Sequence, residues 1–207
     1  MSKIFKTFIT MFLLWSCNSS EMKNINDGTN EIEISTKTIQ EANESLNNID
    51  QKINILRTKE PIKSEDITKV FPIKILDFQR GKYTSQQSYN AMNFVFGDAT
   101  YLNKEKTINI TITDGAGETG SAMVSIIMLA LHSNVNKRNA QGFEETGVLN
   151  GKRAIFKEEI LQGNNKQKLY SIQYITRDRY AISISSKQVD LNELKKFNQH
   201  LKLDQLP

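Results

Sequence analysis

The first apolar stretch of the chain is short and lies next to its start. Mostly apolar residues run from Phe8 to Trp15, after two basic residues, Lys3 and Lys6. A basic start, a short apolar run and a small residue after it are typical of a secretory signal peptide. The run falls well short of the ~20 residues that a membrane-spanning helix needs. We therefore expect residues 1–16 to be removed as a signal peptide.

A polar stretch and then a helical pattern follow. Residues 17–34 show little apolar periodicity, which predicts a flexible tether. Within residues 35–60, Thr38 and Glu41 have the spacing of a helix capping box, and Pro61 ends the pattern. Between these signals six apolar residues alternate at spacings of three and four: Ile39, Ala42, Leu46, Ile49, Ile53 and Leu56. This seam predicts a separate amphipathic helix.

The heptad seam has two interpretations. It either joins copies of the chain in a coiled coil, or forms one face of a helix that docks on its own domain or stands as a short stalk. Ala42 is a weak core residue, and the seam covers only about two and a half heptads. We favour the second interpretation, and a monomer over a coiled-coil oligomer.

From about Val70 the apolar period changes from 3.6 to 2, which marks the globular domain within residues 61–207. Strand patterns cover residues 71–78, 93–101 and 107–113, with a turn expected at Arg80–Gly81. Residues 121–133 form a strongly apolar helix, and residues 134–142 read as a polar loop.

The second half of the domain also consists of strand patterns followed by a helix. Strand patterns cover residues 147–149, 153–161, 168–176 and 180–185. Turn signals separate them at Asn150–Gly151, residues 163–165 and Arg177–Asp178. Asp190 is placed to cap a final helix over residues 191–203. The sequence therefore predicts an α+β domain, with a largely antiparallel sheet packed against two helices.

Charge and cysteine content narrow the function classes. The formal charge of +4 includes Lys3 and Lys6, so the 191 residues after the leader carry 25 basic against 23 acidic residues. This near balance, without a block of basic residues, argues against a nucleic-acid partner. The single cysteine, Cys17, excludes an internal disulfide framework.

Cys17 lies at the end of the apolar run, in the sequence Leu14–Trp15–Ser16–Cys17. This stretch resembles the lipobox of bacterial lipoproteins, with Trp15 as its one departure from the pattern. The resemblance implies cleavage before Cys17 and a lipid (diacylglycerol and an acyl chain such as palmitate) on that residue. It also implies the bacterial cell envelope. Because Asn18 and not Asp follows the cysteine, the outer membrane is the expected location.

The domain is similar to small uncharacterised envelope lipoproteins, and its order of elements resembles the PsbP-like fold. The residues that carry the first resemblance are Thr113–Asp114–Gly115 at a strand end, Asn150–Gly151 with Lys152–Arg153–Ala154, and Arg179–Tyr180. Both resemblances cover about residues 70–204. Folds of this kind have varied binding roles, so they imply little about activity.

One motif suggests a nucleotide site but has the wrong context. Residues 115–120 read Gly-Ala-Gly-Glu-Thr-Gly between a strand and a helix, which matches the dinucleotide-binding spacing. The preceding strand alternates, however, whereas the corresponding strand of a dinucleotide-binding fold is continuously apolar. We expect a glycine turn into a helix start, which is able to hold an anion on its free N–H groups, and no nucleotide.

No catalytic or metal constellation emerges. His132 and His200 each fall near a helix end, far apart in the sequence. The acid pairs Glu144–Glu145 and Glu158–Glu159 lie on strands, where neighbours point to opposite faces. The sequence therefore predicts no enzyme, no cofactor and no metal site.

Two functions remain. The first is an interaction module that binds an envelope protein near the membrane. The alternative is a carrier or sensor of an apolar ligand, such as a lipid, in a groove between the 121–133 helix and the sheet. Tyr170 and Tyr174, with Ile172, share one strand face and are candidates to line such a groove; ordinary core packing is the competing interpretation.

Overall fold

The computed structural model describes residues 28–87, 94–161 and 167–207 of the chain. The chain divides into two units, Met1–Ala42 and Asn43–Pro207, and each is described by itself. Of the first unit the structure describes the N-terminal part of one helix. The predicted signal peptide, Cys17, and residues 17–27 of the predicted tether lie outside the described residues.

Helix α1 spans Gly28–Thr58 and begins earlier than the sequence pattern indicates. Residues 28–34, which we assigned to the tether, are helical. The segment contains no proline, and Glu31 and Glu33 lie in the first turns, where the helix dipole favours acidic residues. Ile32 also stands seven residues before Ile39, in step with the seam.

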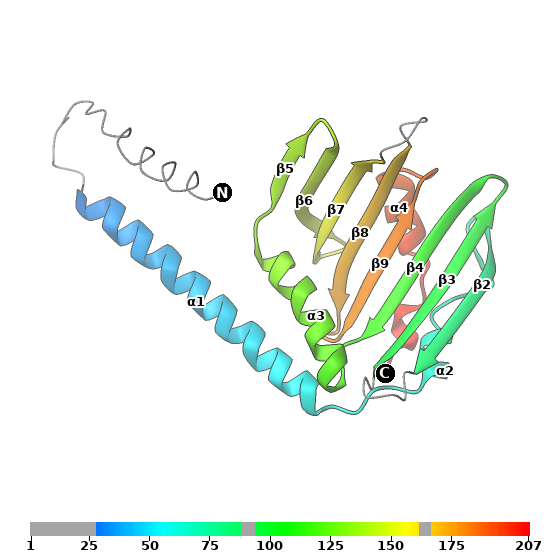
Figure 1. Cartoon of the computed structure of the whole chain (residues 1–207), viewed down its shortest axis with the longest axis horizontal. Helices are drawn as coiled ribbons and strands as arrows, with labels where there is room; N and C mark the ends of the chain where they lie inside the picture. Colours follow the sequence, from blue (N-terminus) through cyan, green and yellow to red (C-terminus); the bar gives the residue numbers. More distant parts are fainter. Residues whose placement is uncertain (1–27, 88–93, 162–166) are drawn as a thin grey trace, which may run out of the picture. The chain divides into compact units, whose positions relative to one another are not determined.

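The second unit is an α+β domain built on one antiparallel sheet, as the sequence predicts. The described strands are β1 (Lys74–Ile75), β2 (Phe78–Gln87), β3 (Val95–Asn103), β4 (Lys106–Asp114), β5 (Asn136–Asn139), β6 (Gly142–Leu149), β7 (Lys152–Ile160), β8 (Lys168–Thr176) and β9 (Tyr180–Ser186). Their spatial order is β1-β2-β3-β4-β9-β8-β7-β6-β5 (Figure 1). The last strand, β9, therefore lies in the middle and joins two antiparallel meanders.

The main core lies on one face of this sheet. The register places Ile110 of β4 opposite Ile184 of β9, and Ile112 opposite Ile182, and all four are buried. Two short helices, α2 (Ser64–Thr68) and α4 (Leu191–Asn198), contribute to this core. Phe197 of α4 contacts the ring edges of Phe78 and Tyr101, with centroids 5.7 and 5.1 Å apart.

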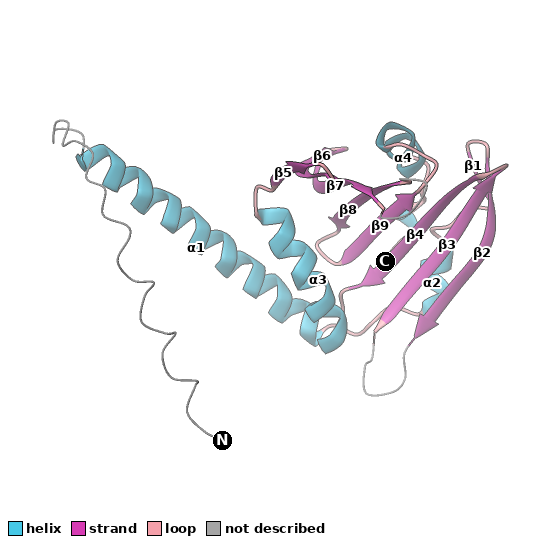
Figure 2. Cartoon of the chain, turned by 45° about the horizontal axis from the view of Figure 1, so that its top comes forward, coloured by secondary structure: helices cyan, strands magenta, loops and turns pink. Residues whose placement is uncertain are grey.

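A smaller apolar cluster lies on the other face. Helix α3 (Gly117–His132) buries Val124 and Met128 against Ala181 of β9. Three residues from the part of α1 in the second unit complete the cluster: Ile49, Ile53 and Leu56. In Figure 2, α3 and α4 lie on different sides of the central strands. The sheet thus has helices on both faces, but only the α2–α4 side has an extended core.

Two local predictions were wrong. Arg80 and Gly81 do not form a turn but lie inside β2, at a register shift between Arg80 and Tyr83. The turn falls instead between β1 and β2 and includes Leu76 with a φ of 51°. Because glycine is common at irregular strand positions, Gly81 marks a bulge here. Residues 136–139, expected in a loop, form the edge strand β5.

Other local predictions are confirmed. Asn150 and Gly151 have φ values of 50° and 79° and form a two-residue hairpin turn between β6 and β7. Asp190 accepts a hydrogen bond from the Glu193 N–H at 2.9 Å and caps α4. The final helix is shorter than predicted, because α4 ends at Asn198 and a 3-10 turn (Leu203–Gln205) follows. The turn predicted at residues 163–165 lies outside the described residues.

Candidate functional site

The sheet face on the α3 side is polar wherever α3 does not cover it, and we call this surface the open face. Cross-strand neighbours on it include Lys157, Ser171, Ser185, Asn109 and Thr100 in one row. The adjacent row runs from Gln173 through Ser183 and Thr111 to Asp98. These residues are half-buried or exposed, so they are in reach of solvent.

Two side-chain hydrogen bonds organise the β3–β4 part of the open face. The Thr111 hydroxyl donates to Asp98 Oδ1 at 2.6 Å, and the Thr100 hydroxyl donates to Asn109 Oδ1 at 3.2 Å. Because these hydroxyls are already bonded across the strand pair, this part of the face is fixed in one arrangement.

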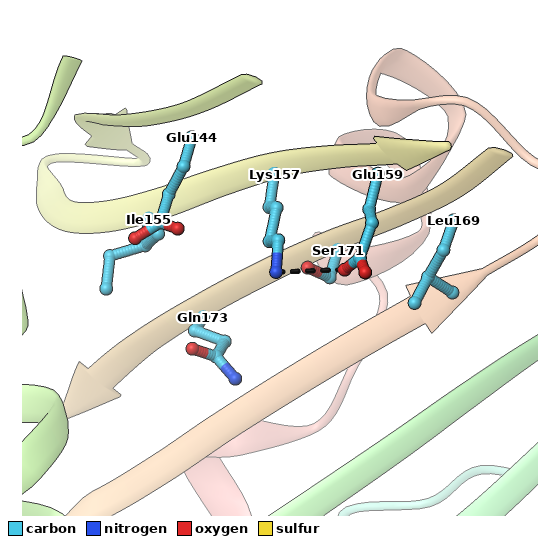
Figure 3. Close-up of a pocket in the computed structure, with 7 residues that line it drawn as sticks. All are labelled: Glu144, Ile155, Lys157, Glu159, Leu169, Ser171 and Gln173. Atoms are coloured by element: carbon cyan, nitrogen blue, oxygen red, sulfur yellow. Dashed lines mark ion pairs between the residues drawn. The ribbon is translucent and has the colours of Figure 1, made fainter. Parts of the chain in front are cut away.

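The β6–β8 part of the open face is hollowed by a cavity of about 210 Å³ (Figure 3). Glu144 comes from β6, and the other lining residues come from β7 and β8: Ile155, Lys157, Glu159, Leu169, Ser171 and Gln173. Lys157 Nζ and Glu159 Oε2 form an ion pair at 2.9 Å. The lining therefore combines charges, a hydroxyl, an amide and two apolar side chains.

The two acids of each neighbouring pair point to opposite faces of the sheet, as predicted. Glu145 pairs with Phe156 on the far face, and Glu158 on that face forms an ion pair with Lys168 at 2.7 Å. One acid of each pair, Glu144 and Glu159, nevertheless lines the same cavity. Sequence reasoning missed this convergence, because it depends on the β6–β7 register.

The lining of this cavity is polar and charged, with two apolar side chains. It holds no histidine or cysteine, and its lysine is already in an ion pair. Among the described residues, no group of three His, Cys, Asp or Glu side chains is arranged to hold a metal. What the lining offers is hydrogen bonding and charge contact with a polar surface.

The glycine motif at residues 115–120 has a packing explanation. A Cβ on Gly120 would lie 2.5 Å from the Asp114 carbonyl oxygen, and one on Gly115 would lie 2.6 Å from the Arg179 carbonyl oxygen. These glycines let α3 start directly against the end of β4. Because β4 pairs antiparallel on both sides, the motif is not part of a parallel β-α-β unit.

A second cavity, of about 390 Å³, lies beside the start of α3. Arg57 and Lys59 contribute positive charge to its lining, but Glu60 and Glu118 contribute the same amount of negative charge. The lining therefore adds no net positive charge to the free N–H groups at the start of α3. An anion at this helix start stays a prediction of the sequence.

A buried ion pair joins three parts of the fold near this point. Asp114 is fully buried and accepts hydrogen bonds from Arg179 Nε at 2.6 Å and Nη2 at 2.8 Å. It also accepts from the backbone N–H groups of Ile62 and Ala116. Arg179 in turn donates to the Glu60 carbonyl at 2.9 Å. The hydrogen bond to Asp114 raises the pKa of Arg179. Since both carboxylate oxygens of Asp114 already accept hydrogen bonds, the role of this residue is structural.

Both histidines lie at helix ends, as predicted. His132 is the last residue of α3, and its Nδ1 lies 2.9 Å from the Met128 carbonyl oxygen. His200 follows α4, and its Nδ1 lies 3.0 Å from the Lys196 carbonyl oxygen. Each ring thus contacts the backbone of its own helix end.

The tyrosines proposed for a groove under the 121–133 helix lie on the opposite face. Tyr174 is buried, and its hydroxyl donates to Oδ1 of Asn198, the last residue of α4, at 2.6 Å. Burial raises the pKa of Tyr174 well above its ordinary value. Tyr170 packs against the same core. Strand alternation determined which residues share a face, but not which helix covers that face, and the assignment to α3 was therefore wrong.

No family model matches the chain, and no curated protein or solved structure does so either. None of the described helices is both long enough and apolar enough to cross a membrane.

Proposed function

We propose that this protein is a non-enzymatic, lipid-anchored protein of the bacterial envelope, which binds a protein partner at the outer membrane. The open face of the sheet is the observation that carries the binding role. It is a partly exposed surface that combines hydroxyls, amides and both signs of charge around a cavity. Interfaces that form and separate are about as polar as the rest of a protein surface, and this face fits that description.

The anchoring role is supported by the lipobox-like sequence that ends at Cys17. Each buried methylene contributes ~0.8 kcal/mol, so two or three acyl chains hold a protein stably at a membrane, where one chain does not. The residues after Cys17 then connect the lipid to the domain. A domain held in this way meets partners that lie in or on the same membrane.

The binding role is tested with a photo-reactive residue placed at Gln173, inside the cavity of the open face. The matched control carries the same group at Asn192, which is exposed on α4. In native membranes we expect one discrete protein adduct from position 173 and none from position 192. Equal labelling of many proteins from both positions, or no protein adduct from position 173, would contradict the proposal.

The same experiment distinguishes the binding of a protein partner from the lipid-carrier alternative. An adduct with the mass of a lipid at position 173, and no protein adduct, would favour the carrier. A charge reversal tests whether the protein adduct depends on the cavity. Glu144→Lys should abolish this adduct, because Glu144 lines the cavity. Glu145→Lys, which changes the neighbouring acid on the far face, should leave it unchanged.

A further inference from the structure

The two edge strands of the sheet, β5 and β1 (Figure 2), differ in length and charge. At one edge β5 has four residues, all exposed, and two of them are Lys137 and Arg138. Short, basic edge strands resist pairing with other chains. At the other edge β1 has two residues and covers only the start of the ten-residue β2.

Most of the outer side of β2 is therefore unpaired among the residues that the structure describes. β1 pairs with Phe78 and Gln79, and the Arg80 N–H donates to the Ile73 carbonyl at 2.8 Å. From Gly81 to Gln87, no described residue pairs with β2 on the side away from β3. Alternate residues of this seven-residue segment thus present backbone N–H and C=O groups with which no described residue pairs, and such a row of groups is the template that another strand recognises.

Beyond its first two residues, the open segment lacks the usual protection of an edge. It contains no proline and a single charge, Lys82. The register shift that could twist it away lies between Arg80 and Tyr83, and from Tyr83 to Gln87 the pairing with β3 is regular. The segment is also rich in residues that favour strands or hydrogen-bond across them, such as Tyr83 and Thr84.

We propose that residues 81–87 of β2 pair antiparallel with the same segment of a second copy of the chain, about a two-fold axis through Thr84. The open segment is centred on Thr84, so this register uses its whole length. It places Lys82 opposite Gln86 of the second copy, and Tyr83 opposite Ser85. No like charges face each other, and the central Thr–Thr pair is a favourable cross-strand pair.

This self-pairing also fits the rest of the surface. A two-fold axis perpendicular to the sheet keeps the same faces on the same side. Thr84 lies opposite Asp98, so the open faces of the two copies would form one continuous surface. The contact is small compared with a standard interface, so the dimer is expected to be weak and concentration-dependent. The inference does not depend on the proposed partner or on the lipid anchor.

The test is disulfide trapping in the full chain. Cys17→Ser removes the native thiol, and single cysteines are then introduced by Thr84→Cys, Ser85→Cys or Arg138→Cys. Residues directly opposite in an antiparallel pair lie within the Cα range of a disulfide, so Thr84→Cys should form covalent dimers on oxidation. In the Ser85→Cys dimer each new thiol would face Tyr83 of the other copy, so the two thiols would lie too far apart. Position 138 is on the protected edge.

We expect the Thr84→Cys variant to dimerise at least about tenfold faster than both controls, because only its thiols fall within bonding range. Equal rates for the three variants would overturn the proposal, and a faster Ser85→Cys reaction would overturn its register. If Thr84→Cys does not fold, a mixture of Lys82→Cys and Gln86→Cys chains decides the question. These positions face each other, so the mixture should give a hetero-disulfide; failure of that reaction would also overturn the proposal.

Discussion

At the scale of single residues, the buried pair of Asp114 and Arg179 joins segments that are far apart in the sequence. It connects the end of β4 and the start of β9 to the backbone of Glu60 and Ile62, between α1 and α2. Sequence analysis singled out both residues but could not pair them, because 65 positions separate them. Local signals such as Asn150–Gly151 were predictable, since a turn is determined by its own residues.

Removal of the Asp114 carboxylate should therefore lower the stability of the fold strongly. Asp114→Ala leaves a guanidinium that is largely buried and lacks its partner, which typically costs about 3–5 kcal/mol in the free energy of unfolding. Lys106→Ala breaks the more exposed pair with Glu193 and should cost less than about 1 kcal/mol. Urea denaturation measures the free energy of unfolding of both variants. Similar decreases for the two variants would contradict the structural role of Asp114.

Tyr101 predicts a specific pH dependence. It is buried, and its hydroxyl donates to the Pro72 carbonyl at 2.8 Å. Burial raises the pKa of Tyr101 to about 12, from its ordinary value of 10.0. Because only the unfolded chain ionises this group in the interval, the stability it provides is present below pH 10 and is lost as the pH rises towards 12.

The comparison with Tyr101→Phe isolates this effect. The stability difference between the parent and the variant should be constant below about pH 9, and it should shift in the parent's disfavour between about pH 10 and 12. Unfolding titrations at several pH values measure it. A difference that stays constant through about pH 11.5 would show that Tyr101 ionises equally in both states.

At the scale of elements, the apolar seam of α1 shows where sequence patterns stop being decisive. Ile49, Ile53 and Leu56 pack with Val124 and Met128 of α3. The same spacing would serve a coiled coil, because both arrangements need one apolar stripe. The two arrangements differ in the surface against which the stripe packs. Here that surface belongs to α3, and the periodicity of α1 carries no information about it.

The docking of this segment can be measured by two neighbouring substitutions. Leu56 is 2% exposed and Ile55 is 56% exposed. Leu56→Ala should lower the free energy of unfolding by about 2–5 kcal/mol, because it removes a buried side chain and leaves a cavity. Ile55→Ala, at a solvent-facing position, should change it by less than about 0.5 kcal/mol. Equal effects would show that this part of α1 does not pack on the domain.

At the scale of the whole molecule, the class of fold was predictable from the sequence and the open face was not. Alternating strands, hairpin turns and the Asp190 cap together indicate an α+β domain with an antiparallel sheet. The open face arises because α3 covers only part of one side, and its cavity because β6, β7 and β8 bring Glu144 and Glu159 together. Both depend on long-range pairing, which no local window of the sequence contains.

The proposed binding of a partner at a membrane depends most on the proposed lipid anchor at Cys17. The most direct test is mass spectrometry of the N-terminal peptide from protein extracted from bacterial membranes. We predict a peptide that begins at Cys17 and carries a diacylglycerol on its sulfur and an acyl chain on its amino group. Cys17→Ser should leave the first 16 residues attached. An unmodified Cys17, or normal cleavage of the Cys17→Ser chain, would contradict the account.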